Sequence, residues 1–534
     1  MGSKNVAKDQ APVRNATQVM GRLNLWRPTT VATARQRLEA RTARHCAPWE
    51  EFEVEYVGLR KSFVCNMLYQ ASIYIAPLIT TRYLGGVLGA EGIGRYAFVQ
   101  SIVSYFVLVA TLGTTYYGQR EIAGARELPV ERSRLFFEIA LLRAFNGVAA
   151  FAVFALTVAP HSPDPRLYLI AALEILAVGC DISWFYQGME RFDIIALTSC
   201  GTRIIAIALI LLCVRTREHL NRYVLIYCGS ALAGFLLQWL FLPGRVTLAG
   251  KPELNRTKQH VRVALGLFLA QVAMQVYTVL DKTMIGLLTR SELQNGYYEQ
   301  TQKLIRVLVL ASTSVGTVMA SRVAGLWSRG RNDDIRTLIG LSFRIVCGIS
   351  LPLFVGIQLL ADRFVPWFYG AGFEAVEPLL RTLSVLPFVI GLSGVVGMQY
   401  FVPTGKERWL TLSVTAGSII NFALNCVLIL KWRALGAAAA SVAAEVCVTA
   451  IQFTLARRDV DIGSLPRIAL NYLKYCLPMA AVGYVARRLT GDMPQGVVIV
   501  IAACVAVYLA ELWLCRDPLT AFLNRGEDAQ NGKG

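Results

Sequence analysis

Long apolar runs alternate with short polar connections between residues 62 and 514, whereas residues 1–58 are polar and rich in arginine. Each run holds roughly 20 residues, which as a helix crosses about 30 Å of hydrocarbon. The runs lie at approximately 62–84, 95–117, 136–159, 167–187, 194–214, 222–243, 263–288, 297–320, 338–361, 377–402, 410–431, 434–456, 468–488 and 494–514. The pattern predicts an all-α polytopic membrane protein with about 14 transmembrane helices.

Composition and charge support this class. The chain is 55% hydrophobic and only 16% charged, whereas soluble proteins carry about 25% charged residues. Its net charge of +18 comes from Lys and Arg spread over many short loops, so it does not indicate nucleic acid. The loops that are cytoplasmic when both termini are inside hold more Lys and Arg, which favours that orientation. The scattered Cys and four His predict neither a metal site nor a disulfide framework.

Residues 263–310 combine membrane-like hydrophobicity with dense charge. Asp281 and Lys282 lie within one apolar helix, and Lys303 and Arg306 lie within the next. Each charge costs about 2.5–3.5 kcal/mol at the bilayer centre, so these side chains cannot face lipid. Helical spacing groups them into two polar stripes: Glu299, Gln302, Lys303 and Arg306 on the second helix, and Gln271, Gln275, Thr278 and Lys282 on the first. The stripes form either internal salt bridges that lock a bundle or a solvated transport pathway.

An internal repeat links this stretch to an earlier one. Gly94, Tyr96 and Gln100 recur as Gly296, Tyr298 and Gln302 at an offset of 202 residues. Both copies carry a polar stripe, but only the stripe of the second copy contains charged side chains. The repeat predicts two pseudo-symmetric six-helix lobes. We therefore expect a cytoplasmic tail at 1–58, lobes at 59–250 and 251–460, two further helices at 461–515, and a cytoplasmic tail at 516–534.

Other charges lie deep within the expected spans, and bases outnumber acids among them. Arg143 and Arg203 are two of these bases. A cavity with surplus positive charge favours anions, and guanidinium groups suit phosphate because they bind it in a bidentate way. The chain has no large loop, phosphate-binding glycine loop or paired acidic loop motif, so we do not expect an enzyme or a nucleotide-driven motor.

Several stretches resemble the bacterial polysaccharide flippases of the Wzx-like, oligosaccharide-exporter branch of the MOP/MATE superfamily. They are YIAPLITTRYLGGVLGAEGIGRYAFVQSIVSYF (74–106), GQREIA (118–123), ISWFYQGMERFDIIA (182–196), DKTMIGLL with NGYYEQTQKL (281–304) and GLSGVVGMQYFVPTGKE (391–407). The resemblance runs from about residue 62 to residue 456, and residues 1–58 have no counterpart in the usual pattern.

The resemblance implies a flippase that moves undecaprenyl-pyrophosphate-linked oligosaccharide across the cytoplasmic membrane by alternating access, for surface polysaccharide export. Expected partners are the lipid-linked oligosaccharide and membrane lipids, with a polysaccharide polymerase and a chain-length regulator as further candidates; the protein is expected to be a monomer without cofactors. The substrate-binding candidates are Lys282, Lys303, Arg306, Arg143 and Arg203. The polar or ion-coupling candidates are Asp281, Glu299, Gln302 and Gln275. Tyr298, Trp184 and Tyr186 are candidates for stacking on sugars, although for Trp184 the sequence favours anchoring at the membrane interface.

Two alternatives remain at this stage. One is a cation-coupled exporter of small molecules with the same fold, whose usual substrates are cations. The other is a membrane polysaccharide polymerase or ligase, for which the expected large outer loop is missing.

Overall fold

The computed structural model describes residues 49–247, 264–265, 268, 272, 279–491 and 495–517. The chain divides into two compact units, residues 1–64 and 65–534. In the first unit the described residues, 49–64, form the beginning of helix α3. Everything below concerns the second unit.

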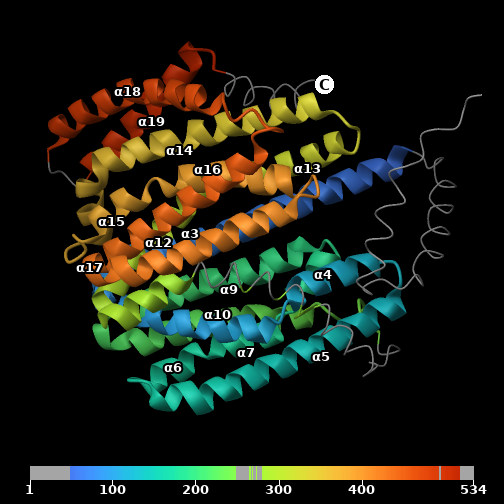
Figure 1. Ribbon diagram of the computed structural model, residues 1–534. Helices are drawn as coiled ribbons and strands as arrows, with labels where there is room; N and C mark the ends of the chain where they lie inside the picture. The colour runs from blue at the N-terminus through green and yellow to red at the C-terminus, as the bar shows by residue number, and fades with distance from the viewer. Residues whose placement is uncertain are drawn as a thin grey trace, which may run out of the picture. The chain divides into compact units, whose positions relative to one another are not determined.

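The described elements are helical (Figure 1). The helices of the first half are α3 (Trp49–Thr111), α4 (Thr114–Gly124), α5 (Pro129–Val153), α6 (Pro165–Ala171), α7 (Leu173–Cys180), α8 (Ser183–Gly188), α9 (Phe192–Cys213) and α10 (Leu220–Leu240). Residues 279–289 are helical. The later helices are α12 (Glu292–Thr313), α13 (Gly316–Trp327), α14 (Asn332–Tyr369), α15 (Val376–Leu383), α16 (Leu386–Val396), α17 (Glu407–Ala456), α18 (Leu465–Thr490) and α19 (Gly496–Leu514).

Local sequence signals set several of these helix ends. Asp164 caps α6 by accepting a hydrogen bond from the Leu167 amide at 3.2 Å. Ser291 caps α12 in the same way, through the Gln294 amide at 3.4 Å. Both side chains satisfy an amide that has no partner within its helix. Proline stands in the first turn of α5 and of α18, where its missing N–H leaves no helical bond unmade.

Within the described ranges, ten helical stretches are long and apolar enough to cross a membrane. The expectation of about fourteen spans is consistent with this number. Two of the ten each hold two expected spans: α3 with α4, which bends at Gly89, and α17, which breaks at Arg433. Helix α18 is long but less apolar and is not among the ten, and the expected span 263–288 lies partly outside the described residues. The all-α, multi-pass class is confirmed.

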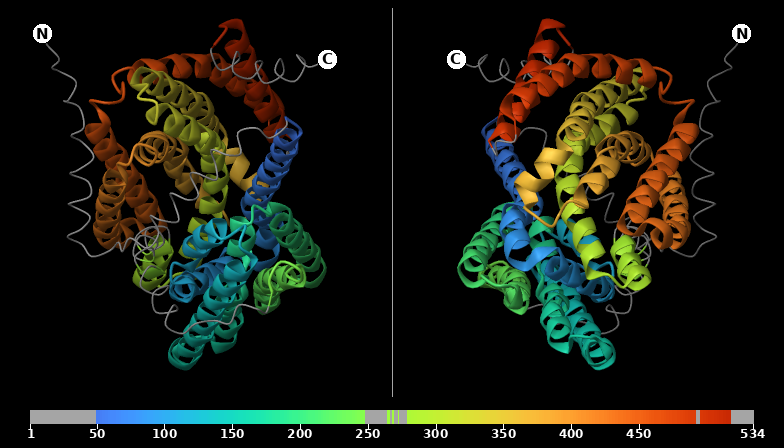
Figure 2. Two further views of the ribbon diagram at one scale, coloured as in Figure 1. Left: turned by 90° about the vertical axis from the view of Figure 1, so that its right-hand side faces the viewer. Right: turned by 90° about the vertical axis from the view of Figure 1, so that its left-hand side faces the viewer.

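Helix contacts fall into two groups. Helices α4 to α10 pack on one another, and α12 to α19 pack on one another. The cyan-to-green helices accordingly gather in one region and the yellow-to-red helices in another (Figure 2). We call these sets, with the adjoining residues 65–111 and 279–289, the N-group and the C-group. The lobe boundaries expected from the sequence remain predictions.

The repeat-equivalent glycines meet where α3 of the N-group crosses α12 of the C-group. A Cβ atom added to Gly94 would clash with the carbonyl oxygen of Glu292, and one added to Gly296 would clash with that of Ala90. The two contacts are reciprocal, because Glu292 is the repeat equivalent of Ala90. This is the geometry of a two-fold related interface. Arg95 Nε donates to Glu292 Oε1 across the crossing at 2.9 Å. Only glycine lets two helices approach backbone to backbone in this way.

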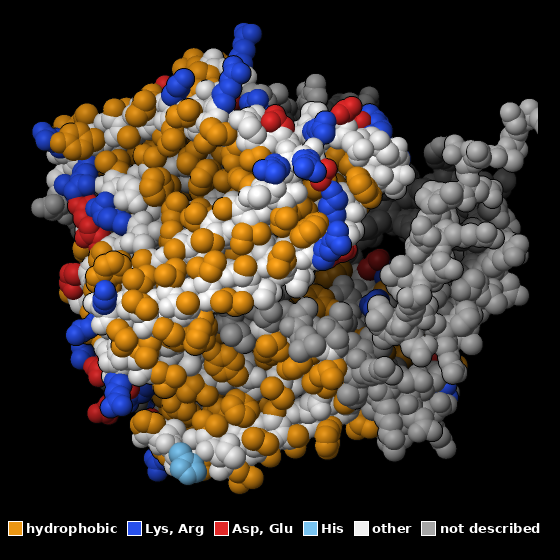
Figure 3. Space-filling view, viewed as in Figure 1, with side chains coloured by type: hydrophobic (Ala, Val, Ile, Leu, Met, Phe, Trp, Pro, Cys, Tyr) orange, Lys and Arg blue, Asp and Glu red, His pale blue; other side chains and the backbone are white. Residues whose placement is uncertain are grey.

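The outer surface also fits a membrane protein. Large hydrophobic side chains such as Leu156, Leu209 and Leu430 are exposed. In Figure 3 hydrophobic side chains cover the middle of the face shown, while Lys, Arg, Asp and Glu gather toward its margins. An apolar band bounded by charge is the surface that a bilayer requires.

We predict that Gly94→Ala and Gly296→Ala each destabilise the protein by about 1–3 kcal/mol, because a methyl group at the crossing forces the helices apart. The measurement is the melting temperature of the purified protein. Gly86→Ala on the same helix is the matched control, since a Cβ there meets nothing within 4 Å. Equal melting temperatures for all three variants would contradict the tight crossing.

Candidate transport cavity

A cavity of about 630 Å³ lies between the two groups. The N-group contributes side chains from α3, α7 and α10, and the C-group contributes side chains from residues 279–282 and from α12, α16 and α17. The polar lining residues are Tyr74, Tyr96, Gln100, Ser104, Glu174, Tyr223, Tyr227, Asp281, Lys282, Glu299, Gln302, Lys303, Arg306, Thr313, Ser441 and Glu445. The predicted stripe on α12 therefore faces this cavity. Gln275 lies outside the described residues.

Glu299 connects the two lysines of the cavity. Its carboxylate lies 3.1 Å from Lys282 Nζ and 4.0 Å from Lys303 Nζ. Lys282 and Glu299 are nearly buried, whereas 18% of the Lys303 side chain is exposed. A buried carboxylate and ammonium offset each other's desolvation. Lys282 is thus neutralised within the wall, and Lys303 keeps an accessible ammonium group.

Asp281 lies beside this pair in a different environment. Asn425 Nδ2 donates to its Oδ1 at 2.7 Å, Ser441 Oγ donates to its Oδ2 at 2.6 Å, and the Tyr298 hydroxyl also donates to Oδ2. Gln302 Nε2 donates to the Tyr298 hydroxyl at 2.9 Å. Among the described residues no base forms an ion pair with Asp281, although its side chain is buried. Neutral hydrogen bonds alone leave a negative charge uncompensated.

Arg306 is exposed to the cavity one helical turn beyond Lys303. Within the described part of the chain its guanidinium has neither an ion pair nor a hydrogen bond. Lys303 and Arg306 are therefore the cations that can receive an anionic ligand. The expected surplus of positive charge is not found on the described lining, because three bases share it with four carboxyl groups, those of Glu174, Asp281, Glu299 and Glu445. The positive charge is local to one stretch of α12.

The structure does not bring Arg143 and Arg203 to this lining. Arg143 is sealed within the N-group, where its Nη2 lies 2.7 Å from Asp181 Oδ2 and its Nε donates to the Val178 carbonyl at 2.8 Å. Only 2% of the Arg143 side chain is exposed. Arg203 on α9 does not line the cavity. The position of a base deep within an expected span did not show whether its side chain lines the cavity or is buried between helices of one group.

The structure also contradicts the expectation that the aromatic side chains of Trp184, Tyr186 and Tyr298 stack on sugars. Trp184 and Tyr186 are fully buried in the N-group core, and Tyr298 is buried with its hydroxyl bound to Asp281. Trp184 packs against Gly118, and Gly188 packs against Gln119 and Ile122. Two of the sequence stretches that carry the family resemblance therefore form a structural joint between α4 and α8.

Four tyrosines and a carboxyl group line the cavity without having been expected to. Tyr74 and Tyr96 come from α3, Tyr223 and Tyr227 from α10, and Glu174 from α7. Three signals were available. Tyr96 belongs to the internal repeat, Glu174 is a charge deep within an expected span, and the four-residue spacing of Tyr223 and Tyr227 places both on one face of a helix. Nothing in the sequence shows which way that face points.

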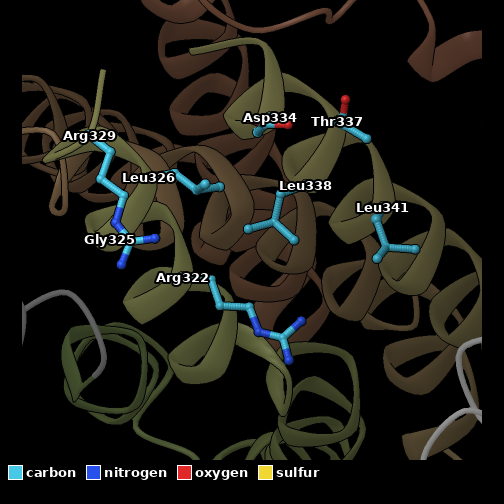
Figure 4. A pocket seen from close by; sticks show the side chains of 8 residues that line it. All are labelled: Arg322, Gly325, Leu326, Arg329, Asp334, Thr337, Leu338 and Leu341. Atoms are coloured by element: carbon cyan, nitrogen blue, oxygen red, sulfur yellow. The ribbon is translucent and has the colours of Figure 1, made fainter. Parts of the chain in front are cut away.

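Further pockets lie apart from the cavity. One of about 670 Å³ lies beyond the Gly94–Gly296 crossing and is lined by both groups, including Arg95, Asn221 and Tyr297. The crossing thus separates it from the central cavity. Another pocket, of about 380 Å³, lies between α13 and α14 (Figure 4). There Leu326 and Leu338 lie between the helices, and Arg322 and Arg329 lie at the rim.

Comparison with known proteins gives three kinds of match. The polysaccharide biosynthesis protein family model matches residues 59–320. A putative O-antigen transporter of Escherichia coli (strain K12) is 22% identical over 422 residues, which cover 76% of this chain and 98% of that protein. The probable low-salt glycan biosynthesis flippase Agl15 of Haloferax volcanii is 23% identical over 225 residues, covering 42% of this chain and 46% of that protein.

Solved structures show the same fold. The lipid II flippase MurJ, in an inward closed conformation, has a TM-score of 0.69 and 15% identity, covering 86% of this chain and 99% of that one. An inward-facing multidrug resistance MATE family transporter of the MOP superfamily has a TM-score of 0.58 and 14% identity, covering 76% of this chain and 99% of that one.

The fold is that of multi-pass membrane transporters, and the relatives are named as transporters and flippases rather than as catalytic enzymes. The matches confirm the recognition made from the sequence. The chain is similar to the bacterial polysaccharide flippases of the MOP superfamily, in the Wzx-like branch.

We predict that Arg143→Met lowers the free energy of unfolding by about 3–5 kcal/mol, because it leaves the Asp181 carboxylate buried without a cation. The double variant Arg143→Met/Asp181→Asn should recover much of this loss. The asparagine side chain keeps the oxygen that accepts a hydrogen bond from the Ser183 backbone N–H at 2.8 Å. The measurements are the melting temperature and transport by cells expressing each variant. A stable double variant without transport would contradict a purely structural role for Arg143.

Proposed function

We propose that this protein is a flippase for undecaprenyl-pyrophosphate-linked oligosaccharides, which it moves across the cytoplasmic membrane for surface polysaccharide export. Neither a pyrophosphate nor a glycan crosses about 30 Å of hydrocarbon unaided, because neither finds partners there. A cavity between two helix groups supplies those partners. The relatives named for O-antigen transport and glycan flipping support this substrate class.

The observation that carries the proposal is the accessible pair of cations on α12. Lys303 and Arg306 project into the cavity, and the Glu299 carboxylate lies 4.0 Å from Lys303 Nζ. When a pyrophosphate binds, Lys303 and Arg306 hydrogen-bond its oxygens, and charge-assisted bonds of this kind are the strong ones. Glu299 holds Lys282 and Lys303 in place while the cavity is empty. Gln302 contributes an amide to the same wall.

Alternating access fits the position of the crossing. The cavity ends at the Gly94–Gly296 contact, and the pocket of about 670 Å³ begins beyond it. With both termini in the cytoplasm, the crossing closes the outer end, so the lipid headgroup enters from the inside. Rocking of the two groups about this contact then opens the outer pocket, while the prenyl chain stays in lipid.

Asp281 is the proposed site of the driving cation. Its buried carboxylate has neutral partners only, and the buried Oδ1 of the neighbouring Asn425 has no hydrogen-bond partner within the described residues. Such a group of oxygen atoms can accept a sodium ion. A bound sodium ion removes the uncompensated charge.

Lys303→Ala and Arg306→Ala are each predicted to abolish surface glycan while membrane abundance stays normal, because each removes an accessible cation from the cavity. The measurement is glycan staining of cells in which the variant replaces the native gene. Lys474→Ala on α18 is the control, since this lysine is exposed and does not line the cavity. Normal glycan output from both cavity variants would refute the assigned role.

The four carboxyl groups of the cavity favour a second candidate, an exporter of small organic cations. The same cells distinguish the two functions. If the protein is a flippase, cells that carry the native gene make surface glycan and export ethidium no faster than cells that lack the gene. Ethidium efflux without any change in surface glycan would support the exporter instead.

We predict that sodium raises the melting temperature of the purified protein, because a cation that binds only the folded state stabilises it. Sodium chloride is compared with choline chloride at equal ionic strength. Asp281→Asn should abolish the response and Asp333→Asn, which removes a fully exposed carboxylate, should keep it. A response that survives in Asp281→Asn would place the ion elsewhere.

A further inference from the structure

The two walls of the cavity differ in chemistry although they come from equivalent halves of the repeat. Gln100 and Ser104 of α3 face the cavity at the positions that correspond to Gln302 and Arg306 of α12. The same helical face is thus neutral in the N-group and cationic in the C-group. No Lys or Arg lines the described N-group side, where Glu174 is the one acidic or basic residue. This described side of the cavity therefore offers a phosphate no cation.

Three tyrosines of this N-group wall form one cluster. The rings of Tyr96 and Tyr223 meet edge to face with centroids 5.6 Å apart, and Tyr227 lies 6.1 Å from each. Tyr96 and Tyr223 are each 6% exposed, so their rings are held in place by packing. Cavity-lining aromatic rings offer flat apolar faces together with polar edges.

The hydroxyl groups of this cluster are available to a ligand. In the described structure the hydroxyls of Tyr223 and Tyr227 have no hydrogen-bond partner, and that of Tyr96 has only the Cys228 sulfur at 3.9 Å. These hydroxyls face the cavity, where a neutral ligand with many hydroxyls can bond to them as both donor and acceptor. Gln100 and Glu174 add an amide and a carboxyl group to the same wall.

We propose that Tyr96, Tyr223 and Tyr227, with Gln100 and Glu174, form a saccharide-recognition site, which we call the tyrosine wall. This inference rests on the proposed flippase function and deepens it. The pyrophosphate binds Lys303 and Arg306 on the C-group, and the first sugars bind the tyrosine wall on the N-group. The sugar hydroxyls bond to the tyrosine hydroxyls and to Glu174, and the sugars pack on Tyr227, the least buried of the three rings. Bound substrate therefore bridges the two groups.

The test separates sugar recognition from pyrophosphate recognition. The full chain is reconstituted in nanodiscs and titrated with two probes. One is undecaprenyl pyrophosphate, and the other is the lipid-linked oligosaccharide fraction extracted from cells in which the gene is deleted. Dissociation constants are measured by native mass spectrometry, which also identifies the bound glycan by mass.

The wild-type protein should bind the lipid-linked oligosaccharide about tenfold more tightly than undecaprenyl pyrophosphate, since two or more neutral hydrogen bonds supply a factor of this size. Tyr223→Phe/Tyr227→Phe keeps both rings and removes both hydroxyls. It should bind the two probes about equally, with its affinity for undecaprenyl pyrophosphate unchanged. Lys303→Ala should weaken both. Tyr116→Phe is the matched control, because Tyr116 is exposed on α4 and does not line the cavity.

Other results would overturn the proposal in distinguishable ways. If the double phenylalanine variant keeps the tenfold preference, the tyrosine wall does not recognise the sugar. If the variant loses affinity for both probes equally, the hydroxyls are needed for the shape of the whole cavity, and the assignment of the tyrosine wall to sugar recognition is wrong. If the wild-type protein binds neither probe, the flippase function itself fails and the tyrosine wall fails with it.

Discussion

Charges that a bilayer cannot solvate organise this protein. Lys282, Glu299 and Lys303 form a connected set of ion pairs at the centre of the helix bundle, with the closest N–O distance 3.1 Å. The free-energy cost of leaving such groups in hydrocarbon is the reason that α12 turns its polar face inward. Once that face is inward, a second set of helices must cover it, and the cavity between the two groups follows.

The structure uses charged pairs in two different ways. The Arg143–Asp181 pair is sealed and holds helices of the N-group together, with its remaining donors bound to a backbone carbonyl and to Thr115 at 3.1 Å. Around Glu299 the pairing is incomplete, and Lys303 and Arg306 remain accessible. Sealed pairs stabilise a fold, while accessible ones can exchange their partners for a ligand. This difference separates the structural from the proposed functional charges.

The internal repeat gives the molecule a symmetric backbone, but its two copies carry side chains of different chemistry. Symmetry lies in the backbone, where Gly94 and Gly296 make reciprocal contacts. The difference lies in the side chains, because one copy of the repeat carries Gln100, Ser101 and Ser104 where the other carries Gln302, Lys303 and Arg306. A substrate with a charged and an uncharged part matches such a pair of unlike walls.

Sequence alone determined the class, the approximate spans, the repeat and the inward charges of α12, because each follows from local composition and helical spacing. It did not show that Arg143 is sealed, that Trp184 is core, or that Tyr223 and Tyr227 face the cavity. Those properties depend on which helix covers each face, and residues far apart in the chain decide that. Gly118, for example, leaves space for the side chain of Trp184, which lies 66 residues later in the sequence. Only the tertiary structure could therefore separate a buried ion pair from an available one, and a packed ring from a cavity wall.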